Sequence, residues 1–309
     1  MSYEGYTNGA SRRDFLRATS LAAGALAAGT LTPEPTQAAK PQGLLAEATR
    51  VGLVDTNVSL GRWPCRKLAL DDTPALVAKL RSCNVKQAWA GSFDALLHKD
   101  LAAVNARLAE ECRRHGRGML IPFGSVNPAL PSWEDDLRRC HEHHRMPGVR
   151  LHPGYHAYKL TDPRFARCLD AAAERGLIVQ LVLTMEDERT QNPVLPVPNV
   201  DASPLATLLS SRPALRLVLL NWFRSAKAPL LGKLTTGARV YFDVATVEGV
   251  GGVSTLLKQV PPQRVLFGSH APFFYLESAI LKLQESDLRE TELVGISSTN
   301  AQELLKAGA

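Results

Sequence analysis

The sequence lacks the cysteine pattern of a disulfide-bonded or zinc-binding protein. Its five cysteines form no C-x-x-C pair, and their number is odd, so a complete disulfide framework is excluded. The last four, Cys83, Cys112, Cys140 and Cys168, are separated by 29, 28 and 28 residues, and each falls in a helical stretch that follows a strand-like one. We expect each to be a small apolar residue packed beneath a helix of a repeating βα unit, rather than a reactive thiol.

Other classes of protein are excluded by further absences. Hydrophobic residues make up 45% of the chain and charged residues 21%, which argues against wholesale disorder and fibrous structure. The net charge of +6 comes without a basic block or interleaved aromatic residues, so it favours anionic partners weakly and does not predict nucleic-acid binding. Beyond the N-terminal region, no stretch is long and apolar enough to span a bilayer.

The first 38 residues resemble an export signal of the twin-arginine type. An arginine pair lies within Ser11–Leu16, a soft Ala/Gly/Leu stretch follows from Ala18 to Leu31, and Thr36-Gln37-Ala38 resembles a cleavage site. We expect the twin-arginine translocation machinery as a partner, cleavage after Ala38, a periplasmic or extracellular location, and no stable membrane insertion afterwards. Residues 39–309 then form one domain of 271 residues, the size of a single α/β barrel.

Eight apolar runs rich in β-branched residues alternate with helical patterns along this domain. They begin near Val51, Val85, Gly118, Gly148, Leu177, Leu215, Val240 and Val265. Between the runs, apolar residues recur at helical spacing, as at Leu101, Val104 and Leu108. No G-x-G-x-x-G follows any run, which argues against a doubly wound open sheet. The pattern predicts a single (β/α)8 barrel of the TIM type, with two short helices, about 275–284 and 299–306, after the eighth strand.

In such a barrel, the functional residues lie where the strands end. The predicted strands or the loops directly after them carry Asn57, Ser59, Arg62, Arg150, His152, His156, Glu186, Asn221, Asp243 and His270, and a Pro/Asn-rich loop runs from Gln191 to Pro204. Three of the eight histidines therefore fall on one face of the barrel, which indicates a functional site.

Three segments resemble the amidohydrolase-related family of metal-dependent hydrolases. They are D-T-N-V-S-L-G at 55–61, G-V-R-L-H-P at 148–153 and V-L-F-G-S-H-A-P at 265–272, of which the last is the most specific. The resemblance implies the family's barrel fold and an activity among hydrolases, lactonases and non-oxidative decarboxylases.

The chain departs from the metal-binding pattern of that family. Asn57 and Ser59 replace the His-x-His of the first strand, and the fifth strand has no His. Asn221 stands where the sixth strand often carries His, and His270 stands where the eighth carries Asp. Amide and hydroxyl oxygens are poor substitutes for imidazole and carboxylate on zinc. We therefore predict a site without a metal or other cofactor; a divalent metal such as zinc is the less favoured alternative.

The remaining residues predict an acid–base site. His270 takes the place of the family's catalytic Asp and is predicted to transfer protons, with a pKa of about 6 to 7 if unperturbed; a structural histidine is the alternative. Asn57 and Asn221 would polarise a carbonyl, and His152 would assist. The predicted substrate contacts are Arg150 and Arg62 as a carboxylate clamp, together with His156, Ser59, Glu186 and Asp243.

Two functions stay open at this point. One is an exported enzyme that hydrolyses or decarboxylates a small anionic substrate. The other is a catalytically inactive barrel that binds a small molecule or serves as an interaction partner. The fold alone does not decide between them, and the concentration of polar residues at the strand ends favours the enzyme.

Overall fold

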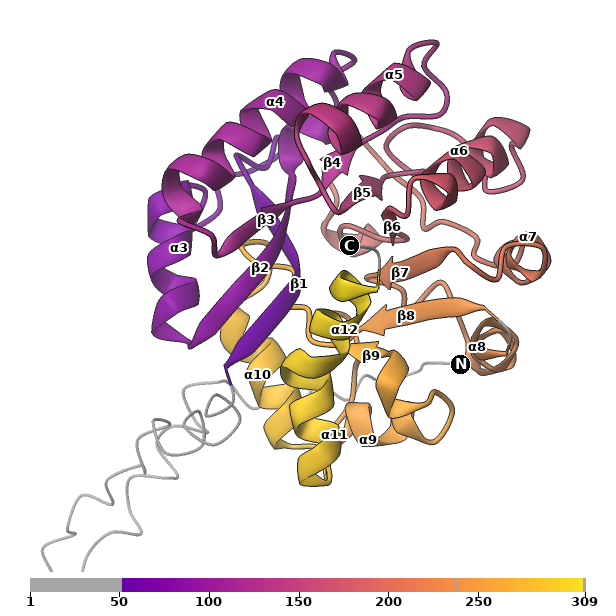
Figure 1. Cartoon of the computed structure of the whole chain (residues 1–309). Coiled ribbons are helices and arrows are strands. Elements are labelled where there is room, and N and C mark those ends of the chain that lie inside the picture. The colour runs from indigo at the N-terminus through magenta and orange to yellow at the C-terminus, as the bar shows by residue number, and fades with distance from the viewer. Residues whose placement is uncertain (1–51, 237, 308–309) are drawn as a thin grey trace, which may run out of the picture. The chain divides into compact units, whose positions relative to one another are not determined.

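The computed structural model describes residues 52–307, apart from residue 237. Parallel strands alternate with helices along this range (Figure 1). The predicted export segment and its cleavage site after Ala38 lie outside the described residues. Within the range that is described, no helix is both long and apolar enough to cross a membrane.

The strands pair in parallel and in sequence order. They are β1 (Leu53–Leu60), β2 (Val85–Ser92), β3 (Leu120–Pro122), β4 (Gly124–Ser125), β5 (Gly148–Leu151), β6 (Ile178–Val182), β7 (Arg216–Leu220), β8 (Arg239–Asp243) and β9 (Val265–Leu266). β3 pairs with β2 and β4 pairs with β5, so the two act as one strand interrupted at Phe123. The amide of Phe123 donates to the carbonyl of Ala90 at 2.8 Å and continues the ladder.

Backbone hydrogen bonds also join the two ends of this series of strands. The amide of Thr56 in β1 donates to the carbonyl of Phe267, directly after β9, at 2.9 Å. The amide of Ser59 donates to the carbonyl of Ala271 at 2.9 Å, and Val58 forms a parallel bridge with Ala271. The ring is therefore closed, and the (β/α)8 barrel predicted from the sequence is confirmed.

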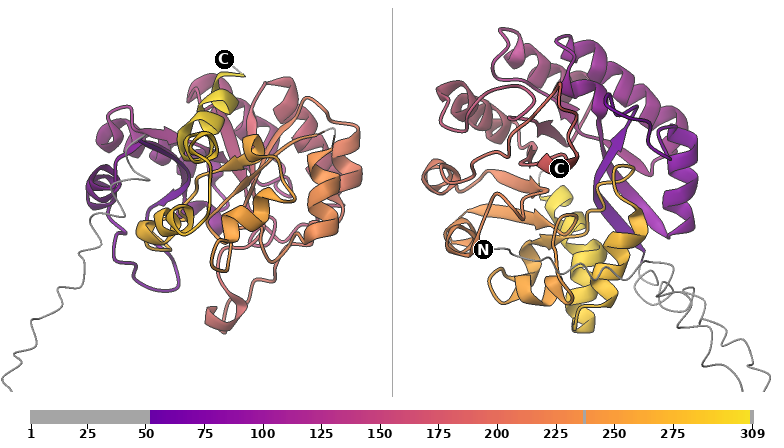
Figure 2. Two further views of the ribbon diagram at one scale, coloured as in Figure 1. Left: turned by 90° about the horizontal axis from the view of Figure 1, so that it is seen from below. Right: turned by 180° about the vertical axis from the view of Figure 1, so that it is seen from behind.

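The helices form an outer layer around the strands (Figure 2). They are α3 (Thr73–Ser82), α4 (Leu101–Glu111), α5 (Trp133–Arg138), α6 (Pro163–Glu174), α7 (Leu205–Ser210), α8 (Ala228–Thr235), α9 (Gly252–Leu257), α10 (Leu276–Gln284), α11 (Glu290–Val294) and α12 (Asn300–Lys306). Aspartates cap three of them: the carboxylates of Asp72, Asp100 and Asp162 accept from backbone amides in the first turns of α3, α4 and α6. Such caps satisfy amides that have no partner inside the helix, so local sequence sets where these helices begin.

Three of the regularly spaced cysteines lie in the core between the strands and the outer helices. Cys112, Cys140 and Cys168 are buried, whereas Cys83 is partly buried at the end of α3. Burial raises the pKa of each of the three buried thiols to about 12. They therefore pack as small apolar residues, as predicted, and thiolate chemistry is disfavoured.

The last helices close the end of the barrel at which the strands begin. Ala301 and Leu304 of α12 pack with Val218 and Leu266 in the barrel interior, and Figure 1 shows α12 across the ring of strands. The guanidinium of Arg216, at the start of β7, donates to the carbonyl of Leu304 at 2.6 Å. The helices predicted at about 275–284 and 299–306 correspond to α10 and α12, whereas α11 and the π-helical turn that joins it to α12 were not predicted.

Candidate functional site

A cavity of about 600 Å³ opens at the end of the barrel where β6, β7 and β8 run out. Its walls come from the loops after these strands and from one face of α10. They comprise Thr184, Met185, Glu186, Asp187, Asn221, Arg224, Ala245, Thr246, Val247, Glu248, Gly249, Val250, Phe274, Ser278, Lys282 and Glu285. Ligands of such barrels bind at this end, so the cavity is the candidate site. Of the predicted residues, Asn221 and Glu186 line it.

Four of the predicted residues form one hydrogen-bonded chain in the barrel wall beside this cavity. The Asn57 amide nitrogen donates to Asp243 Oδ2 at 2.7 Å and to Asn221 Oδ1 at 2.9 Å. Asn221 Nδ2 lies 3.5 Å from His270 Nδ1, and His270 Nε2 lies 2.9 Å from the carbonyl of Met185. A carbonyl only accepts, so Nε2 carries the proton and Nδ1 accepts from Asn221. The chain therefore selects one neutral tautomer of His270.

Burial shifts the pKa of both titratable groups at the ends of this chain. It raises the pKa of Asp243 to about 7, against the lowering effect of the hydrogen bond from Asn57. It lowers the pKa of His270 to about 4, although the hydrogen bond to Met185 opposes the change. The value of 6 to 7 was expected only for an unperturbed His270, and burial does perturb it, because a fully buried imidazolium loses its hydration. At neutral pH His270 is uncharged, and Asp243 is protonated in part of the molecules.

The two residues at the end of the chain nearest the cavity have an unusual backbone. Asn221 has a φ of +53° and His270 a φ of +59°. This left-handed conformation is costly for residues other than glycine, and it recurs at functional sites. The amide of Asn221 donates to Asp243 Oδ1 at 3.0 Å, and the Trp222 indole donates to the Asp243 carbonyl at 2.8 Å. These bonds hold the strand end in the conformation that places Asn221 between the cavity and Asn57.

Asp55 was not predicted as a site residue, yet it accepts hydrogen bonds from Asn57 and from Ser269, the residue before His270. Its Oδ1 accepts from the backbone amides of Asn57 and Ser269, each at 3.0 Å, and its Oδ2 accepts from the Ser269 hydroxyl at 2.5 Å. Burial raises its pKa to about 6. Asp55 thereby ties the end of β1 to the segment that carries His270. Its place at the head of the D-T-N-V-S segment was the available sequence signal.

Arg150 and Ser59 contact each other inside the barrel and do not line the cavity. The Arg150 guanidinium donates to Gln180 Oε1 at 2.8 Å, to the Val58 carbonyl at 2.9 Å, to Ser59 Oγ at 3.2 Å and to the Trp89 carbonyl at 3.1 Å. Four of its five N–H groups are thus engaged within the protein. The predicted carboxylate clamp through Arg150 is corrected: this arginine cross-links strands, and Ser59 is one of its partners.

Arg62, the other half of the predicted clamp, is exposed and is absent from the lining of this cavity. Its neighbour Arg66, which was not predicted, forms an ion pair with Glu186 and lies 4.7 Å from the centre of the Phe273 ring. Glu186 is only 3% exposed, so this pair neutralises a buried carboxylate at the cavity wall. The structure therefore brings Arg66 to the site in place of Arg62.

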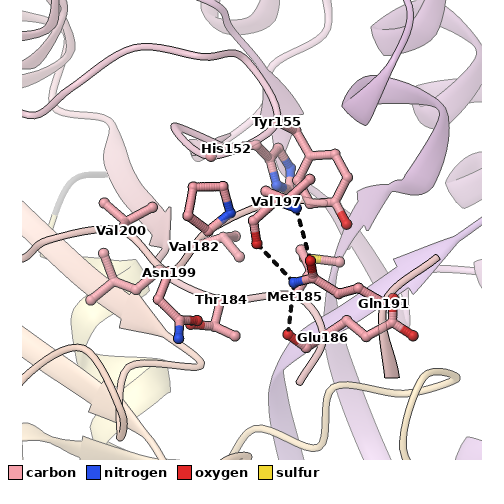
Figure 3. Close-up of a pocket in the computed structure, with 13 residues that line it drawn as sticks. His152, Tyr155, Val182, Thr184, Met185, Glu186, Gln191, Val197, Asn199 and Val200 are labelled. Atoms are coloured by element: carbon pink, nitrogen blue, oxygen red, sulfur yellow. Dashed lines mark hydrogen bonds between the residues drawn. The ribbon is translucent and has the colours of Figure 1, made fainter. Parts of the chain in front are cut away.

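His152 lines a second, much smaller cavity, and the centre of its ring lies 5.9 Å from that of His156. This cavity of about 10 Å³ is lined by His152, Tyr155 and the 191–200 loop, and it shares Thr184, Met185 and Glu186 with the large one (Figure 3). Neither ring nitrogen of the buried His152 has a hydrogen-bond partner among the described residues. His156 Nε2 lies 2.8 Å from the carbonyl of Ala95. Burial lowers the pKa of both histidines, so both are neutral at pH 7.

The side chain of Gln191 helps to hold the predicted 191–204 loop against the small cavity. Gln191 Nε2 donates to the Val197 carbonyl at 2.7 Å, and Gln191 Oε1 accepts from the Val197 amide at 2.8 Å (Figure 3). The same nitrogen lies 3.4 Å from the Glu186 carbonyl. The Gln191 amide thus fixes the loop to the strand end that carries Met185 and Glu186.

The large cavity also contains charged residues that the sequence did not single out. Arg224 forms ion pairs with Asp187 at 2.9 Å and with Glu248 at 3.0 Å. Lys282 donates to the carbonyls of Ala245 and Val244, the latter at 3.4 Å. Lys282 shares a face of α10 with Ser278, four residues earlier, and both line the cavity. This helical spacing was the only feature of the sequence that could have placed Lys282 at the site.

Comparisons with known proteins place this barrel among related folds. The profile of the Amidohydrolase family matches residues 64–307. No curated protein matches the chain. Among solved structures, 2,6-dihydroxybenzoate decarboxylase from Rhizobium is 14% identical with a TM-score of 0.66, over 84% of this chain and 99% of its own.

Two further solved structures were determined with bound manganese. The 5-carboxyvanillate decarboxylase from Novosphingobium aromaticivorans is 12% identical with a TM-score of 0.66, over 84% of this chain and 98% of its own. The dihydroxybenzoic acid decarboxylase from Polaromonas is 13% identical with a TM-score of 0.64, over the same shares of the two chains. At such identities the likeness establishes the fold.

The manganese in these two structures overturns the prediction of a site without metal. That prediction weighed the ligands that zinc prefers, whereas manganese also suits carboxylate and carbonyl oxygens. The described residues, however, contain no group of three or more His, Cys, Asp or Glu side chains placed to hold a metal ion. Asn57, Asn221 and His270 instead bond to one another. The donors as arranged do not fit a metal ion, so no chemical step is routed through one below.

Proposed function

The chain belongs to the amidohydrolase family, and from this premise we propose that it is an enzyme that decarboxylates a small aromatic acid without an oxidant. The similar folds of decarboxylases of dihydroxybenzoate and carboxyvanillate support this choice over ester or lactone hydrolysis. The size and lining of the cavity supply further support.

The observation that carries the proposal is the chain from Asp243 through Asn57 and Asn221 to His270, next to the cavity. Decarboxylation replaces a carboxyl group with a proton, so the site must hold a proton close to the ring carbon. Asp243, with a pKa of about 7, holds one in part of the molecules at neutral pH, and neutral His270 can accept one. Asn221 lines the cavity, and of the two N–H groups on its Nδ2 one points to His270, which leaves the second to polarise the substrate.

The cavity suits an aromatic acid in size and in polarity. Its volume of about 600 Å³ lies within the range of roughly 300–1,000 Å³ that is usual for small-molecule sites. Met185, Val247 and Phe274 supply apolar surface for a ring, and Lys282 supplies a positive charge for an anionic group. This lining supports the expectation of a small anionic substrate.

The test is a turnover assay with two named probes, 2,6-dihydroxybenzoate and 5-carboxyvanillate. We expect carbon dioxide and the decarboxylated arene to appear in equal amounts. The assay is run on protein stripped of metal and on protein reconstituted with Mn²⁺, and bound metal is measured in parallel. Hydrolysis of ester or lactone probes without release of carbon dioxide would refute decarboxylation and leave a hydrolase.

A second candidate is a barrel that binds the aromatic acid without turning it over. The observation that favours it is the mutual hydrogen bonding of Asn57, Asn221 and His270, which occupies polar groups that an enzyme would present to substrate. Calorimetric binding of both probes, with no product under any metal condition, would establish this alternative.

Export is part of the same proposal and rests on the N-terminal resemblance alone. Replacement of the pair Arg12-Arg13 by Lys-Lys is expected to retain unprocessed precursor inside the cell, because the translocation machinery recognises the arginines. Cell fractionation and N-terminal sequencing are the measurements, and the exported native protein should begin near Ala39. Normal export of the Lys-Lys variant would remove the twin-arginine interpretation.

A further inference from the structure

Two cationic residues, Arg224 and Lys282, line the large cavity, and only Arg224 forms ion pairs with described residues. Arg224 is neutralised by Asp187 and Glu248. Lys282, the other cation of the lining, makes no ion pair with any described residue. A cation that lines a cavity and whose hydrogen-bond partners are neutral carbonyls attracts an anionic ligand group.

The position of the Lys282 ammonium is set by the end of β8. Its nitrogen donates to the carbonyls of Ala245 and Val244, directly after Asp243. An ammonium has three N–H donors, so two are engaged by the backbone and a third remains for a ligand. The backbone contacts also restrain a side chain that is otherwise flexible, which reduces the entropy lost on binding.

The acidic residues of the lining leave room for an anion. Glu186 is paired with Arg66, and Asp187 and Glu248 are paired with Arg224. The remaining acid is Glu285, three residues beyond Lys282 and exposed at the end of α10. An anion that enters the cavity therefore meets one unpaired positive charge, with one unpaired negative charge at the rim.

We propose that Lys282 binds the carboxylate of the ligand and thereby selects acids over their neutral analogues. The carboxylate accepts the free N–H of Lys282, and the ring lies against Phe274 and Val247, which line the same cavity. This inference rests on the proposed function only for the class of ligand, and it does not depend on turnover. Burial lowers the pKa of Lys282, with Asp243, Glu248 and Glu285 opposing the change, so the ammonium is partly stripped of water and gains more from an anionic partner.

The test compares benzoate with benzamide, which has the same ring and no charge. Calorimetric affinities are measured for the native protein, Lys282→Met, Glu285→Gln and the control Lys258→Met, whose lysine is exposed and lies outside the cavity lining. Loss of a charged hydrogen bond predicts that Lys282→Met binds benzoate about tenfold or more weakly, with benzamide little changed. Glu285→Gln is expected to bind benzoate up to about fivefold more tightly, because a nearby negative charge is removed.

Three results would overturn the inference. They are equal affinity of native protein for benzoate and benzamide, unchanged benzoate affinity in Lys282→Met, and an equal loss of affinity in Lys258→Met. Turnover separates this inference from the proposed function. Protein that binds benzoate through Lys282 but releases no carbon dioxide from either probe acid would sustain the former and refute the latter.

A second measurement covers the case in which Lys282→Met does not fold. Native protein is treated with acetic anhydride, and acetylation of Lys282 is followed by mass spectrometry. Saturating benzoate is expected to slow modification of Lys282 and to leave Lys258 unaffected, while benzamide protects neither. Equal protection by both compounds, or none by benzoate, would contradict carboxylate binding at this lysine.

Discussion

The histidines on the two sides of the barrel mouth are equally buried but differ in their hydrogen bonds. His270, after β9, has a partner at each ring nitrogen, Asn221 at one and the Met185 carbonyl at the other. His152, after β5, has none at either nitrogen among the described residues. Both lose their charge on burial, since the pKa of each is lowered. A position near a strand end therefore does not by itself make a histidine part of the hydrogen-bonded series of side chains. Its hydrogen-bond partners decide that.

The sharpest test of this comparison is the pair of variants His270→Asn and His152→Asn. If His270 exchanges protons with the substrate, His270→Asn should lower turnover by roughly 10²–10⁴-fold, the usual contribution of a positioned acid or base. His152→Asn should lower it much less, because His152 is bonded to none of the chain residues. Steady-state kinetics on the two probe acids measures both, with circular dichroism as the control for folding. Equal losses of turnover in the two variants would show that His270 and His152 do not differ in function.

A second test uses the pH dependence of stability at the other end of the chain. The pKa of Asp243 is raised to about 7 by burial, above its ordinary value of 3.8. Ionisation of this carboxyl therefore costs stability as pH rises from about 4 to about 7, by up to a few kcal/mol at about 1.4 kcal/mol per pKa unit. Asp243→Asn should remove this loss, so its free energy of unfolding relative to native should increase over that range.

Urea unfolding of both proteins at pH 5 and pH 8 measures the difference. Asp55 has a raised pKa as well and remains in both proteins, so the comparison isolates Asp243. His270 acts in the opposite direction at lower pH, because its folded pKa of about 4 lies below its ordinary value of 6.5. If the difference in free energy of unfolding between Asp243→Asn and the native protein does not change with pH, Asp243 is ionised throughout this range. It would then not hold a proton for the reaction.

The smallest expected effect concerns the unpartnered histidine. His152→Leu should raise the free energy of unfolding by about 1 kcal/mol, because a buried polar group without a hydrogen bond costs roughly 1–3 kcal/mol and leucine has none to satisfy. Thermal or urea unfolding provides the measurement, and His270→Leu is the matched variant. It is expected to be destabilising because Asn221 Nδ2 and the Met185 carbonyl lose their hydrogen bonds to the imidazole. A loss of stability in His152→Leu would reveal a partner for the imidazole, such as a bound water in the small cavity beside it.

Much of the fold was predictable because it follows from short-range pattern. The runs that begin near Val85 and Gly148 became β2 and β5, and aspartates such as Asp72 mark where helices start. The residues of the hydrogen-bonded chain were also predicted, since Asp243 ends β8, Asn221 directly follows β7, Asn57 lies in the second half of β1 and His270 comes four residues after β9. Their position at one end of the barrel follows from the parallel arrangement of the strands.

The contacts among those residues were not predictable in the same way. Arg150 and Arg62 have the same side chain, but their environments differ. Arg150 donates its hydrogen bonds to Gln180 and to backbone carbonyls, whereas Arg62 is exposed. Arg66 and Lys282 reach the site from a loop and from a helix distant in sequence from their partners, Glu186 and the end of β8. Such pairings depend on which surfaces the closed ring brings together.

The sequence by itself therefore determined the barrel, the end at which its polar residues gather, and the departures from the family's metal ligands. Only the tertiary structure decided which of those polar groups are free, paired or orphaned, and how far burial moves the pKa of Asp243 and His270. The physical reason is that periodicity and strand ends are local properties of the chain. Desolvation and hydrogen-bond partnership, by contrast, depend on atoms up to 214 residues apart, as between Asp55 and Ser269.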